Sequence, residues 1–328
     1  SYRLYLHTGE KKYLELAYPY FQKYLQYVIT RVNEDGLIDY GLCDWAGPFD
    51  YEDLEGAPTP RAFTDTLLYI KFLKISVIVS EILGEKSDEF EGEFARISGI
   101  FRKKYMNEDG SCKVEEQTAV AMLIYLDFYE DIKPLKAQLE RTVREKDFHL
   151  YVGMVGMRYL LHALSKCDLE EYAYRIMTST GYPSYSEWVK GGATTMWETF
   201  QCTHSRDHHM YSDVISWFIK NILGIKPMME GAGEKLMEVS PYFFRDISYA
   251  RGSYQTRQGR IEVQWEKQGE EITLRLAVPE GVKVRLSFKN AKPQEALNSR
   301  YLEAGQYAIK LYMCDSDDRL TEKRGTFL

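Results

Sequence analysis

The sequence predicts a mainly α-helical chain with a β tail, in which a double ring of helical hairpins is followed by a small antiparallel sheet or sandwich. Two observations carry this prediction. In the first two thirds of the 328 residues, segments that are apolar almost all round alternate with segments that are apolar on one face only. After about residue 235, apolar and polar residues alternate with the period of two that is typical of strands.

Start and stop signals set the bounds of the expected helices. One helix begins with Thr59 as its expected N-cap and Pro60 in its first turn, and it ends at Gly84. Its segment Leu67–Leu83 is apolar almost all round, so we expect it to be buried on every side. The next helix, capped by Ser87, has one apolar face. The expected helices span residues 10–32, 59–84, 87–106, 115–129, 133–146, 153–166, 169–178 and 209–223.

The sequence Asn-Glu-Asp-Gly occurs twice, at residues 33–36 and 107–110, each time directly after an expected helix. A repeated loop indicates a repeated hairpin. Loops favour these residue types in any fold, so chance is the competing interpretation.

Four runs of alternating apolar residues predict the strands of the tail. Turns at residues 268–270 and 279–281 separate three of them. The change of period near Gly231–Glu238 divides the chain into an expected helical domain, residues 1–232, and an expected β-sandwich domain, residues 233–328. The runs are Ile261, Val263 and Trp265; Ile272, Leu274, Leu276 and Val278; Val282, Val284, Leu286 and Phe288; and Ile309, Leu311 and Met313.

Composition narrows the function. The net charge of −7, without a basic patch, argues against a nucleic-acid partner. No stretch approaches the ~20 apolar residues of a membrane span, so no membrane partner is expected. The five cysteines are scattered without a CxxC pair, so we expect neither a disulfide scaffold nor a zinc site, and no cofactor. This pattern favours the cytoplasm, and export through a signal peptide upstream of Ser1 is the open alternative.

The segment at residues 181–200, GYPSYSEWVKGGATTMWETF, is expected to be a loop and is the first candidate for chemistry. Trp188 and Trp197 flank a tight turn at Gly191-Gly192. Glu198 follows directly. A carboxylate beside indoles in a cleft suits a general acid or base. The competing interpretation is a glutamate that satisfies a helix N-terminus.

Two further segments are candidates for substrate binding. Asp44 and Trp45 suit a sugar's hydroxyls and flat face, while local turn bonds and core packing are the competing interpretation. Three histidines lie at residues 204–209, but no H-E-x-x-H helix accompanies them, so no metal is expected and His208 is expected to contact substrate or the base. The acidic run at residues 51–55 is expected to be a solvated loop, with a place in a cleft as the alternative.

Taken in order, these segments resemble the bacterial α-L-rhamnosidases of glycoside hydrolase family 78. The most specific motif is GATTMWE at residues 192–198. The motifs that carry the resemblance are Asp44-Trp45 before Thr59-Pro60, Gly153–Gly156, Tyr182–Tyr185, residues 192–198, Asp207-His208 and Leu223–Pro227.

The resemblance implies a partial (α/α)6 barrel of helical hairpins followed by a small antiparallel β-sandwich. It implies hydrolysis of terminal α-L-rhamnosides with inversion, on a rhamnose-containing oligosaccharide or glycoside. It assigns the general base to Glu198 and suggests that Trp45 and His208 line the sugar pocket. The full set of expected substrate-binding residues is Asp44, Trp45, Trp188, Trp197 and His208.

An inverting glycosidase also needs a carboxyl group as its acid, ~6.5–9.5 Å from the base. The resemblance places that acid in an Arg-Asp-Glu motif upstream of this chain. We therefore expect a fragment or truncated relative, whose open ring exposes inner faces such as Leu67–Leu83 and so favours homo-oligomers. Two other functions stay open: a non-catalytic carbohydrate-binding or accessory protein, and a hydrolase or lyase of another sugar on the same barrel.

Overall fold

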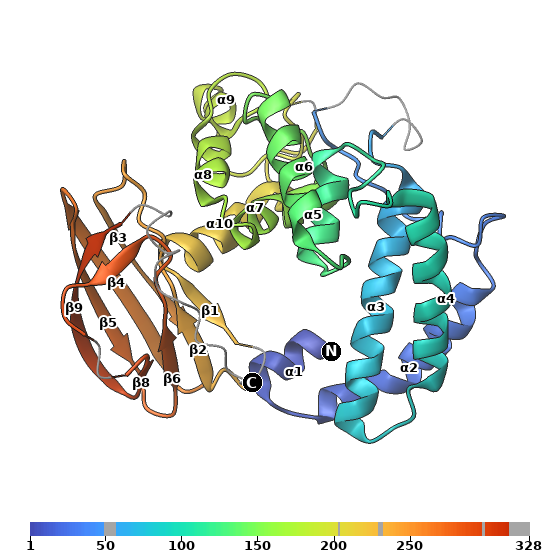
Figure 1. Cartoon of the computed structure of the whole chain (residues 1–328), viewed down its shortest axis with the longest axis horizontal. Coiled ribbons are helices and arrows are strands. Elements are labelled where there is room, and N and C mark those ends of the chain that lie inside the picture. Colours follow the sequence, from blue (N-terminus) through green and yellow to red (C-terminus); the bar gives the residue numbers. More distant parts are fainter. Residues whose placement is uncertain (49–56, 203, 229–231, 297–298, 315–328) are drawn as a thin grey trace. The chain divides into compact units, whose positions relative to one another are not determined.

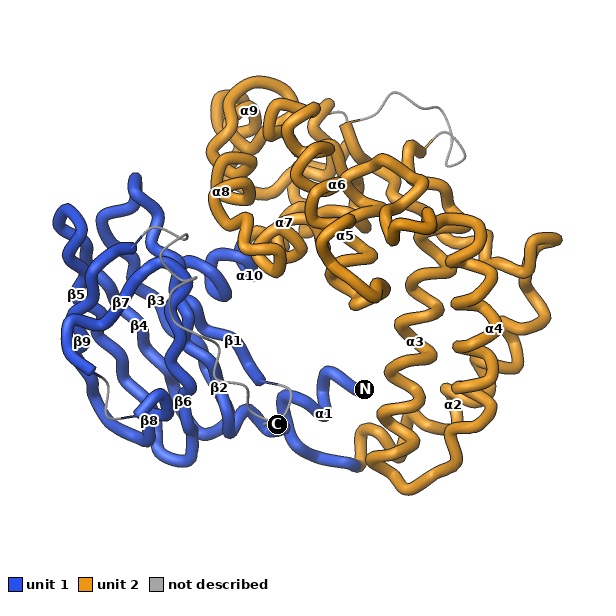
Figure 2. Tube along the Cα trace, in the orientation of Figure 1, with its two compact units in different colours: residues 1–11, 215–328 blue, residues 12–214 orange. Residues whose placement is uncertain are grey.

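The computed structural model describes residues 1–48, 57–202, 204–228, 232–296 and 299–314, so the acidic run at residues 51–55 lies outside the described residues. The chain divides into two compact units (Figure 2). Residues 12–214 form the helical unit, and residues 1–11 together with 215–328 form the sandwich unit. The domain boundary expected after residue 232 stays a prediction.

Consecutive helices of the helical unit pack as hairpins (Figure 1). The pairs are α3/α4, α5/α6 and α7/α8, and α5 contacts both α3 and α7. The helices are α2 (Lys12–Ile29), α3 (Arg61–Leu83), α4 (Asp88–Tyr105), α5 (Gln117–Tyr125), α6 (Ile132–Glu145), α7 (Met154–Lys166), α8 (Glu170–Thr178) and α9 (Tyr185–Lys190).

From α4 to α8, one-sided and fully buried helices alternate, as the sequence predicts. α5 buries every residue from Gln117 to Ile124, and α7 buries every residue from Tyr159 to Ser165. In contrast, α4, α6 and α8 each bury a single stripe. The stripe of α6 consists of Leu135, Gln138, Leu139, Thr142 and Val143. The one-sided helices therefore wall the inner helices α3, α5 and α7.

The expected burial of α3 on every side is wrong in part. Leu67 and Ile70 are buried, but Leu68 and Ile78 are 36% and 38% exposed. Within the described residues, α3 packs mainly on α2, α4 and α5, and these helices leave one apolar strip open. Among the described residues, no helix combines the length and hydropathy that a membrane span requires.

The start of α3 also differs from the prediction. Pro60, not Thr59, occupies the N-cap position, with the extended angles φ −56° and ψ 139°. The helix therefore begins one residue later, at Arg61. Its end is as predicted, because Gly84 adopts the left-handed conformation (φ +73°) that closes helices.

The two Asn-Glu-Asp-Gly loops share one structure. In each, the asparagine N–H donates to the carbonyl four residues later, at 2.8 Å for Asn33 and 2.9 Å for Asn107. The N–H of the loop glycine returns to the asparagine carbonyl, and Gly36 and Gly110 have φ of +77° and +85°. Only glycine adopts such angles freely, so the same four residues form the same turn at both places in the chain.

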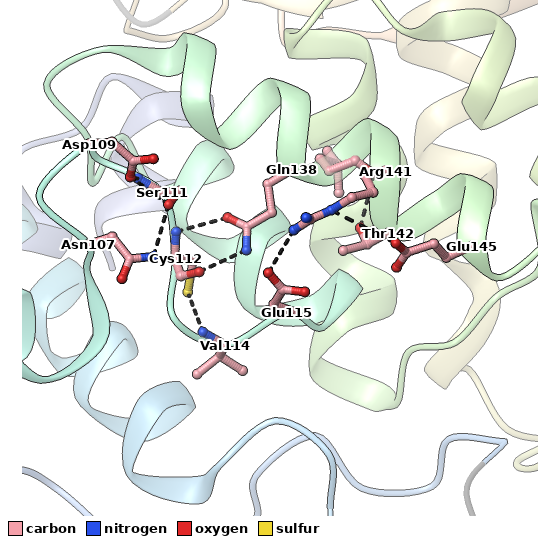
Figure 3. Close-up of polar contacts among 11 residues, drawn as sticks. Asn107, Asp109, Ser111, Cys112, Val114, Glu115, Gln138, Arg141, Thr142 and Glu145 are labelled. Atoms are coloured by element: carbon pink, nitrogen blue, oxygen red, sulfur yellow. Dashed lines mark hydrogen bonds and ion pairs between the residues drawn. The ribbon is translucent and has the colours of Figure 1, made fainter.

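The second of these loops is held by the neighbouring hairpin (Figure 3). The buried amide of Gln138 in α6 accepts from the N–H of Cys112 and donates to its carbonyl, both at 2.8 Å. Burial raises the pKa of the Cys112 thiol to about 12. The two hydrogen bonds from Gln138 satisfy the N–H and the carbonyl of Cys112, which would otherwise be buried without partners.

The helix expected at residues 209–223 is irregular. It consists of a 3-10 turn η2 (Met210–Ser212), a short helix α10 (Asp213–Trp217) and a π turn η3 (Phe218–Ile222). It ends at Gly224, which has φ +78° and lies so close to Pro241 that a Cβ would overlap the backbone.

Two sheets form the sandwich. One has the order β1-β2-β6-β8 and the other β3-β4-β5-β9-β7. The predicted antiparallel pairing is confirmed except between β2 and β6, which are parallel. The strands are β1 (Ile225–Pro227), β2 (Leu236–Val239), β3 (Tyr249–Gln255), β4 (Arg260–Gln268), β5 (Glu271–Val278), β6 (Lys283–Leu286), β7 (Ala291–Pro293), β8 (Tyr301–Leu302) and β9 (Gly305–Met313).

The core of the sandwich comes from the predicted alternation. In β4, Ile261, Val263 and Trp265 are fully buried, while the residues between them face away. The indole N–H of Trp265 donates to the carbonyl of Ile222 at 2.9 Å, so the largest core side chain has its polar atom satisfied.

A helix that the sequence analysis misses, α1 (Tyr2–Thr8), belongs to the sandwich unit. The buried carboxylate of Glu234 holds it there. Its Oε1 accepts from the hydroxyl of Tyr254 at 2.7 Å and lies 2.6 Å from Nδ1 of His7. Both ends of the chain's described sequence therefore contribute to this unit.

Candidate active site

The candidate segment at residues 181–200 contains a short helix where the sequence analysis expects only a loop. This helix, α9, follows Ser184 and ends at Lys190, with Gly191 as its C-cap, and Gly192 then turns the chain with φ +80°. Six residues are too few to produce a readable helical period. The helix brings Trp188 to Trp197 across the Gly-Gly turn, with ring centroids 6.2 Å apart.

Glu198 lies half-buried on a stretch of backbone that pairs with the segment at residues 205–208. Its N–H donates to the carbonyl of Ser205 at 2.9 Å, and the N–H of His208 donates to the carbonyl of Met196 at 2.8 Å. The carboxylate is held as well, because Oε2 accepts from the N–H of Ser205 at 3.1 Å. Within the described residues, Oε1 has no hydrogen-bond partner, so one oxygen is fixed and the other stays available.

Trp188 and Trp197 lie beneath this loop, not on its surface. They are 2% and 5% exposed. Trp188 stacks on Phe200 at 4.8 Å and 21°, and Tyr211 meets it edge-on at 5.6 Å. The guanidinium of Arg206 covers Trp197 at 4.9 Å. Rings packed in this way support the Glu198 loop, and their predicted contact with substrate stays a prediction.

Asp44 is also buried, and its carboxylate holds the start of α7. Oδ1 accepts from the N–H of Gly156 at 2.7 Å, and Oδ2 accepts from the N–H of Gly153 at 2.9 Å and from the hydroxyl of Thr118. Burial raises the pKa of Asp44, and these hydrogen bonds oppose the rise. A carboxylate at a helix N-terminus is favoured by the helix dipole. The geometry therefore gives Asp44 a positioning role, and its contact with substrate stays a prediction.

Trp45 occupies the position where this loop meets α7. Its carbonyl accepts from the N–H of Met154 at 2.8 Å, and a Cβ on Gly153 would overlap the carbonyl oxygens of Asp44 and Trp45. The ring is half-buried. Its enclosed Nε1 has no hydrogen-bond partner among the described residues.

Two contacts join the Trp45 loop to the segment at residues 198–211. The hydroxyl of Tyr211 lies 2.8 Å from the carbonyl oxygen of Ala46, and the amide of Gln201 donates to the carbonyl of Gly47 at 3.4 Å. Segments that lie more than a hundred residues apart in the sequence therefore meet near the start of α7. The structure brings Trp45 and Glu198 into one region of the helical unit.

His208 completes this group. Its ring is half-buried, and Nδ1 accepts from the N–H of Met210 at 3.2 Å. In the neutral ring the proton then lies on Nε2, which has no partner among the described residues. His209 stacks on the ring at 5.2 Å and 5°. His208 is thus held with one donor unused.

Within the described part of the chain, no three histidine, cysteine or carboxylate side chains gather in a way that could hold a metal ion. The three neighbouring histidines do not converge, since His208 and His209 stack face to face.

The residues that the sequence analysis misses are those that hold the site together. They include Tyr185, whose hydroxyl donates to the carbonyl of Tyr211 at 2.7 Å and whose pKa is raised by burial and then by Asp213. They also include Thr118. Gly153 and Gly156 were visible only as part of a motif. The available signal for both was a pair of glycines at the start of a helix, where a Cβ would collide with Asp44 or Thr118.

Comparison with protein families accounts for both units. The profile of the bacterial alpha-L-rhamnosidase 6 hairpin glycosidase domain matches residues 1–222, and that of the bacterial alpha-L-rhamnosidase C-terminal domain matches residues 224–303.

Curated relatives show the same likeness over most of the chain. An α-L-rhamnosidase of Alteromonas sp. (strain LOR) is 25% identical over 343 residues, which cover 94% of this chain and 37% of the relative. One of Streptomyces avermitilis is 25% identical over 291 residues, which cover 84% of this chain and 27% of the relative. The chain thus spans about a third of the length of these relatives.

Solved structures share the fold. The Streptomyces avermitilis α-L-rhamnosidase complexed with L-rhamnose superposes with a TM-score of 0.80 at 22% identity, over 95% of this chain and 31% of that one. The native enzyme of Aspergillus terreus gives 0.84 at 21% identity, over 94% and 37%. The predicted architecture, hairpins of an (α/α)6 barrel followed by a β-sandwich, is confirmed.

Proposed function

Because the chain belongs to the bacterial α-L-rhamnosidases of glycoside hydrolase family 78, we propose that the protein hydrolyses terminal α-L-rhamnosides with inversion, with Glu198 as the general base. The substrate is a rhamnose-containing oligosaccharide or glycoside. The relatives named above carry the activity in their names, and the rhamnose complex indicates the sugar that such a site accommodates.

The geometry of Glu198 supports the proposal. One carboxylate oxygen is held by the N–H of Ser205, while Oε1 has no partner among the described residues. The backbone around it is fixed by hydrogen bonds to Ser205 and by the buried rings of Trp188 and Trp197. A general base must be held in place and still have a free lone pair for the proton it takes.

In an inverting hydrolysis, the base removes a proton from a water molecule while the water oxygen bonds to the anomeric carbon. The bond from that carbon to the leaving oxygen breaks on the opposite face, and a second carboxyl group protonates that oxygen. We assign the first role to Glu198. The expectation that the acid comes from a segment outside these 328 residues stays a prediction.

The other candidate residues fall into two groups in this proposal, those that line the sugar pocket and those that support it. Trp45 and His208 line the sugar pocket, because Nε2 of His208 is an unused N–H donor and the ring of Trp45 is half-buried at the junction of the loops. Asp44, Trp188 and Trp197 act behind them, since all three are buried and held by protein contacts.

The test uses the full-length protein and an aryl α-L-rhamnoside. Glu198→Gln keeps the size of the side chain and one hydrogen-bond acceptor, but it cannot take a proton. We expect kcat to fall by about 10²–10⁴-fold, the usual range for the loss of a general base. The matched control is Glu187→Gln, which removes a charge paired with Lys190 on the exposed side of α9.

Full activity of Glu198→Gln would refute the assignment. Saturable binding of rhamnose in calorimetry, without turnover of the wild-type protein, would favour the non-catalytic carbohydrate-binding alternative. Turnover of a different glycoside in a panel of aryl glycosides, with no turnover of the rhamnoside, would favour a hydrolase or lyase of another sugar.

A further inference from the structure

The outer face of the five-stranded sheet carries a polar hollow that the proposed function does not use. Strand register defines its centre. In one row across the sheet, Arg251, Gln264, Arg275 and Ala308 lie side by side on β3, β4, β5 and β9. The next row consists of Ser253, Glu262, Ala277 and Gln306. Residues of both rows line one hollow of about 770 Å³.

Short side chains form the floor of the hollow, and long side chains form its walls. Ala277 and Ala308 leave room above β5 and β9, whereas Arg251, Gln264 and Gln306 extend around them. A volume of 770 Å³ lies within the ~300–1,000 Å³ range of small-ligand sites. The space is therefore large enough for a short run of sugar rings.

The charge of the hollow is positive although the chain is acidic. Its lining includes three arginines, Arg251, Arg260 and Arg275, against a single carboxylate, Glu262. Arg275 lies 3.6 Å from Glu266. Arg251 and Arg260 have no ion pair within the described residues. A protein with a net charge of −7 thus presents to one hollow two guanidinium groups that form no ion pair in the described part of the chain.

We propose that this hollow binds a short stretch of an acidic polysaccharide, a glycan chain that carries carboxylate groups. Guanidinium groups bind carboxylates through two parallel hydrogen bonds, and the amides of Gln264 and Gln306 suit sugar hydroxyls. Tyr249, which is 62% exposed, offers an aromatic ring at the rim for a sugar face.

A peptide strand cannot join the sheet at the centre of the hollow, although β3 at its margin is an edge strand. β4 and β5 each pair with a neighbour on both sides, so their backbone groups have no capacity to bind an added strand. The inference goes beyond the proposed function, which concerns hydrolysis by the helical unit. In this proposal, the sandwich unit binds the acidic polysaccharide.

The experiment measures binding by calorimetry with the full chain. The probes are a galacturonic acid tetramer, a neutral galactose tetramer of the same length, and a polyglutamate of matched charge. The variants are Arg251→Gln and Arg260→Gln. Arg245→Gln is the matched control, because it removes an exposed arginine, paired with Glu270, from another part of the sandwich unit.

We expect saturable, salt-sensitive binding of the acidic tetramer alone, weakened about fivefold or more by each hollow variant and unchanged by Arg245→Gln. Glu198→Gln should bind it as the wild type does, so failure of the catalytic proposal and failure of this one are separable. The inference is overturned if the acidic tetramer does not bind, if the neutral tetramer or polyglutamate binds equally well, or if Arg245→Gln weakens binding as much as the hollow variants.

Discussion

The carboxylate of Asp44 accepts a hydrogen bond of 2.7 Å from the N–H of Gly156, a residue 112 positions later in the chain. This contact fixes the loop that carries Trp45 to the start of α7, where unsatisfied N–H groups and the helix dipole favour a negative charge. The loop that carries Glu198 is joined to the same place through Gln201. One buried carboxylate therefore fixes the loop that carries Trp45 to the start of α7.

Replacing Asp44 with asparagine tests this role. The substitution exchanges one acceptor oxygen for an NH2 group that faces backbone N–H donors, so buried donors lose their partner. We expect the free energy of unfolding to fall by about 2–4 kcal/mol, measured by denaturant titration. Asp109→Asn, in an exposed loop, is the control and should lower the free energy of unfolding much less, because its contacts are exposed to solvent. Equal losses in the two variants would contradict the anchoring role.

Two substitutions of Trp188 distinguish support of the Glu198 loop from contact with the substrate. Because its ring is buried among Phe200, Tyr185 and Tyr211, Trp188→Ala should cost about 3–5 kcal/mol of stability. Trp188→Phe keeps much of the packing and should leave KM for an aryl rhamnoside within twofold or so of the wild type. A stable Trp188→Phe protein with a strongly raised KM would show instead that the indole contacts the sugar.

Much of the fold follows from local sequence patterns. Helices such as α6 and strands such as β4 are long enough for their periods to be read, and glycines with positive φ, such as Gly84, mark where helices end. The short helix α9 is not predicted, because a helix of about one and a half turns is too short to show a period. The parallel pairing of β2 with β6 is not predicted either, because strands that are distant in the sequence carry no local signal that they pair.

The candidate site was predictable only in outline. A glutamate after a tryptophan, next to a Gly-Gly turn, is a local signal, and Glu198 stands where a base could act. The burial of Trp188 and Trp197 cannot be predicted from the local sequence. It depends on Phe200, Tyr211 and Arg206, which pack over the two rings. The role of Asp44 likewise depends on helices that follow long afterwards in the chain.

His208 offers a sharper test of the sugar pocket. An asparagine oxygen can replace Nδ1 as the acceptor for the N–H of Met210, but asparagine lacks a donor at the position of Nε2. We expect His208→Asn to raise KM roughly fivefold to tenfold, the value of one lost hydrogen bond, with an unchanged melting temperature. His208→Gln, whose amide reaches the position of Nε2, should recover part of the loss. An unchanged KM in His208→Asn would remove His208 from the pocket.

The contact between Tyr172 and Glu140 predicts a pH dependence of stability in the helical unit. The hydroxyl of Tyr172 in α8 donates to Oε1 of Glu140 in α6 at 2.6 Å, and Arg144 donates to the same oxygen at 2.9 Å. The hydrogen bond from Tyr172, followed by that from Arg144, lowers the pKa of Glu140 in the folded protein. A lowered folded pKa means that the stabilisation is complete above the unfolded pKa of about 4.3 and is lost as the pH falls through the folded value.

Tyr172→Phe removes only the hydroxyl and keeps the ring beside Phe148. Because Glu140 is partly exposed, solvent screens the contact, and we expect a loss of about 0.5–1 kcal/mol at pH 7. The difference between wild type and variant should shrink below about pH 4, where the unfolded carboxyl is protonated. Glu140→Gln should remove the same pH-dependent part. Unfolding titrations at several pH values measure this, and a difference of constant size down to pH 3 would show that the carboxylate is not the partner that matters.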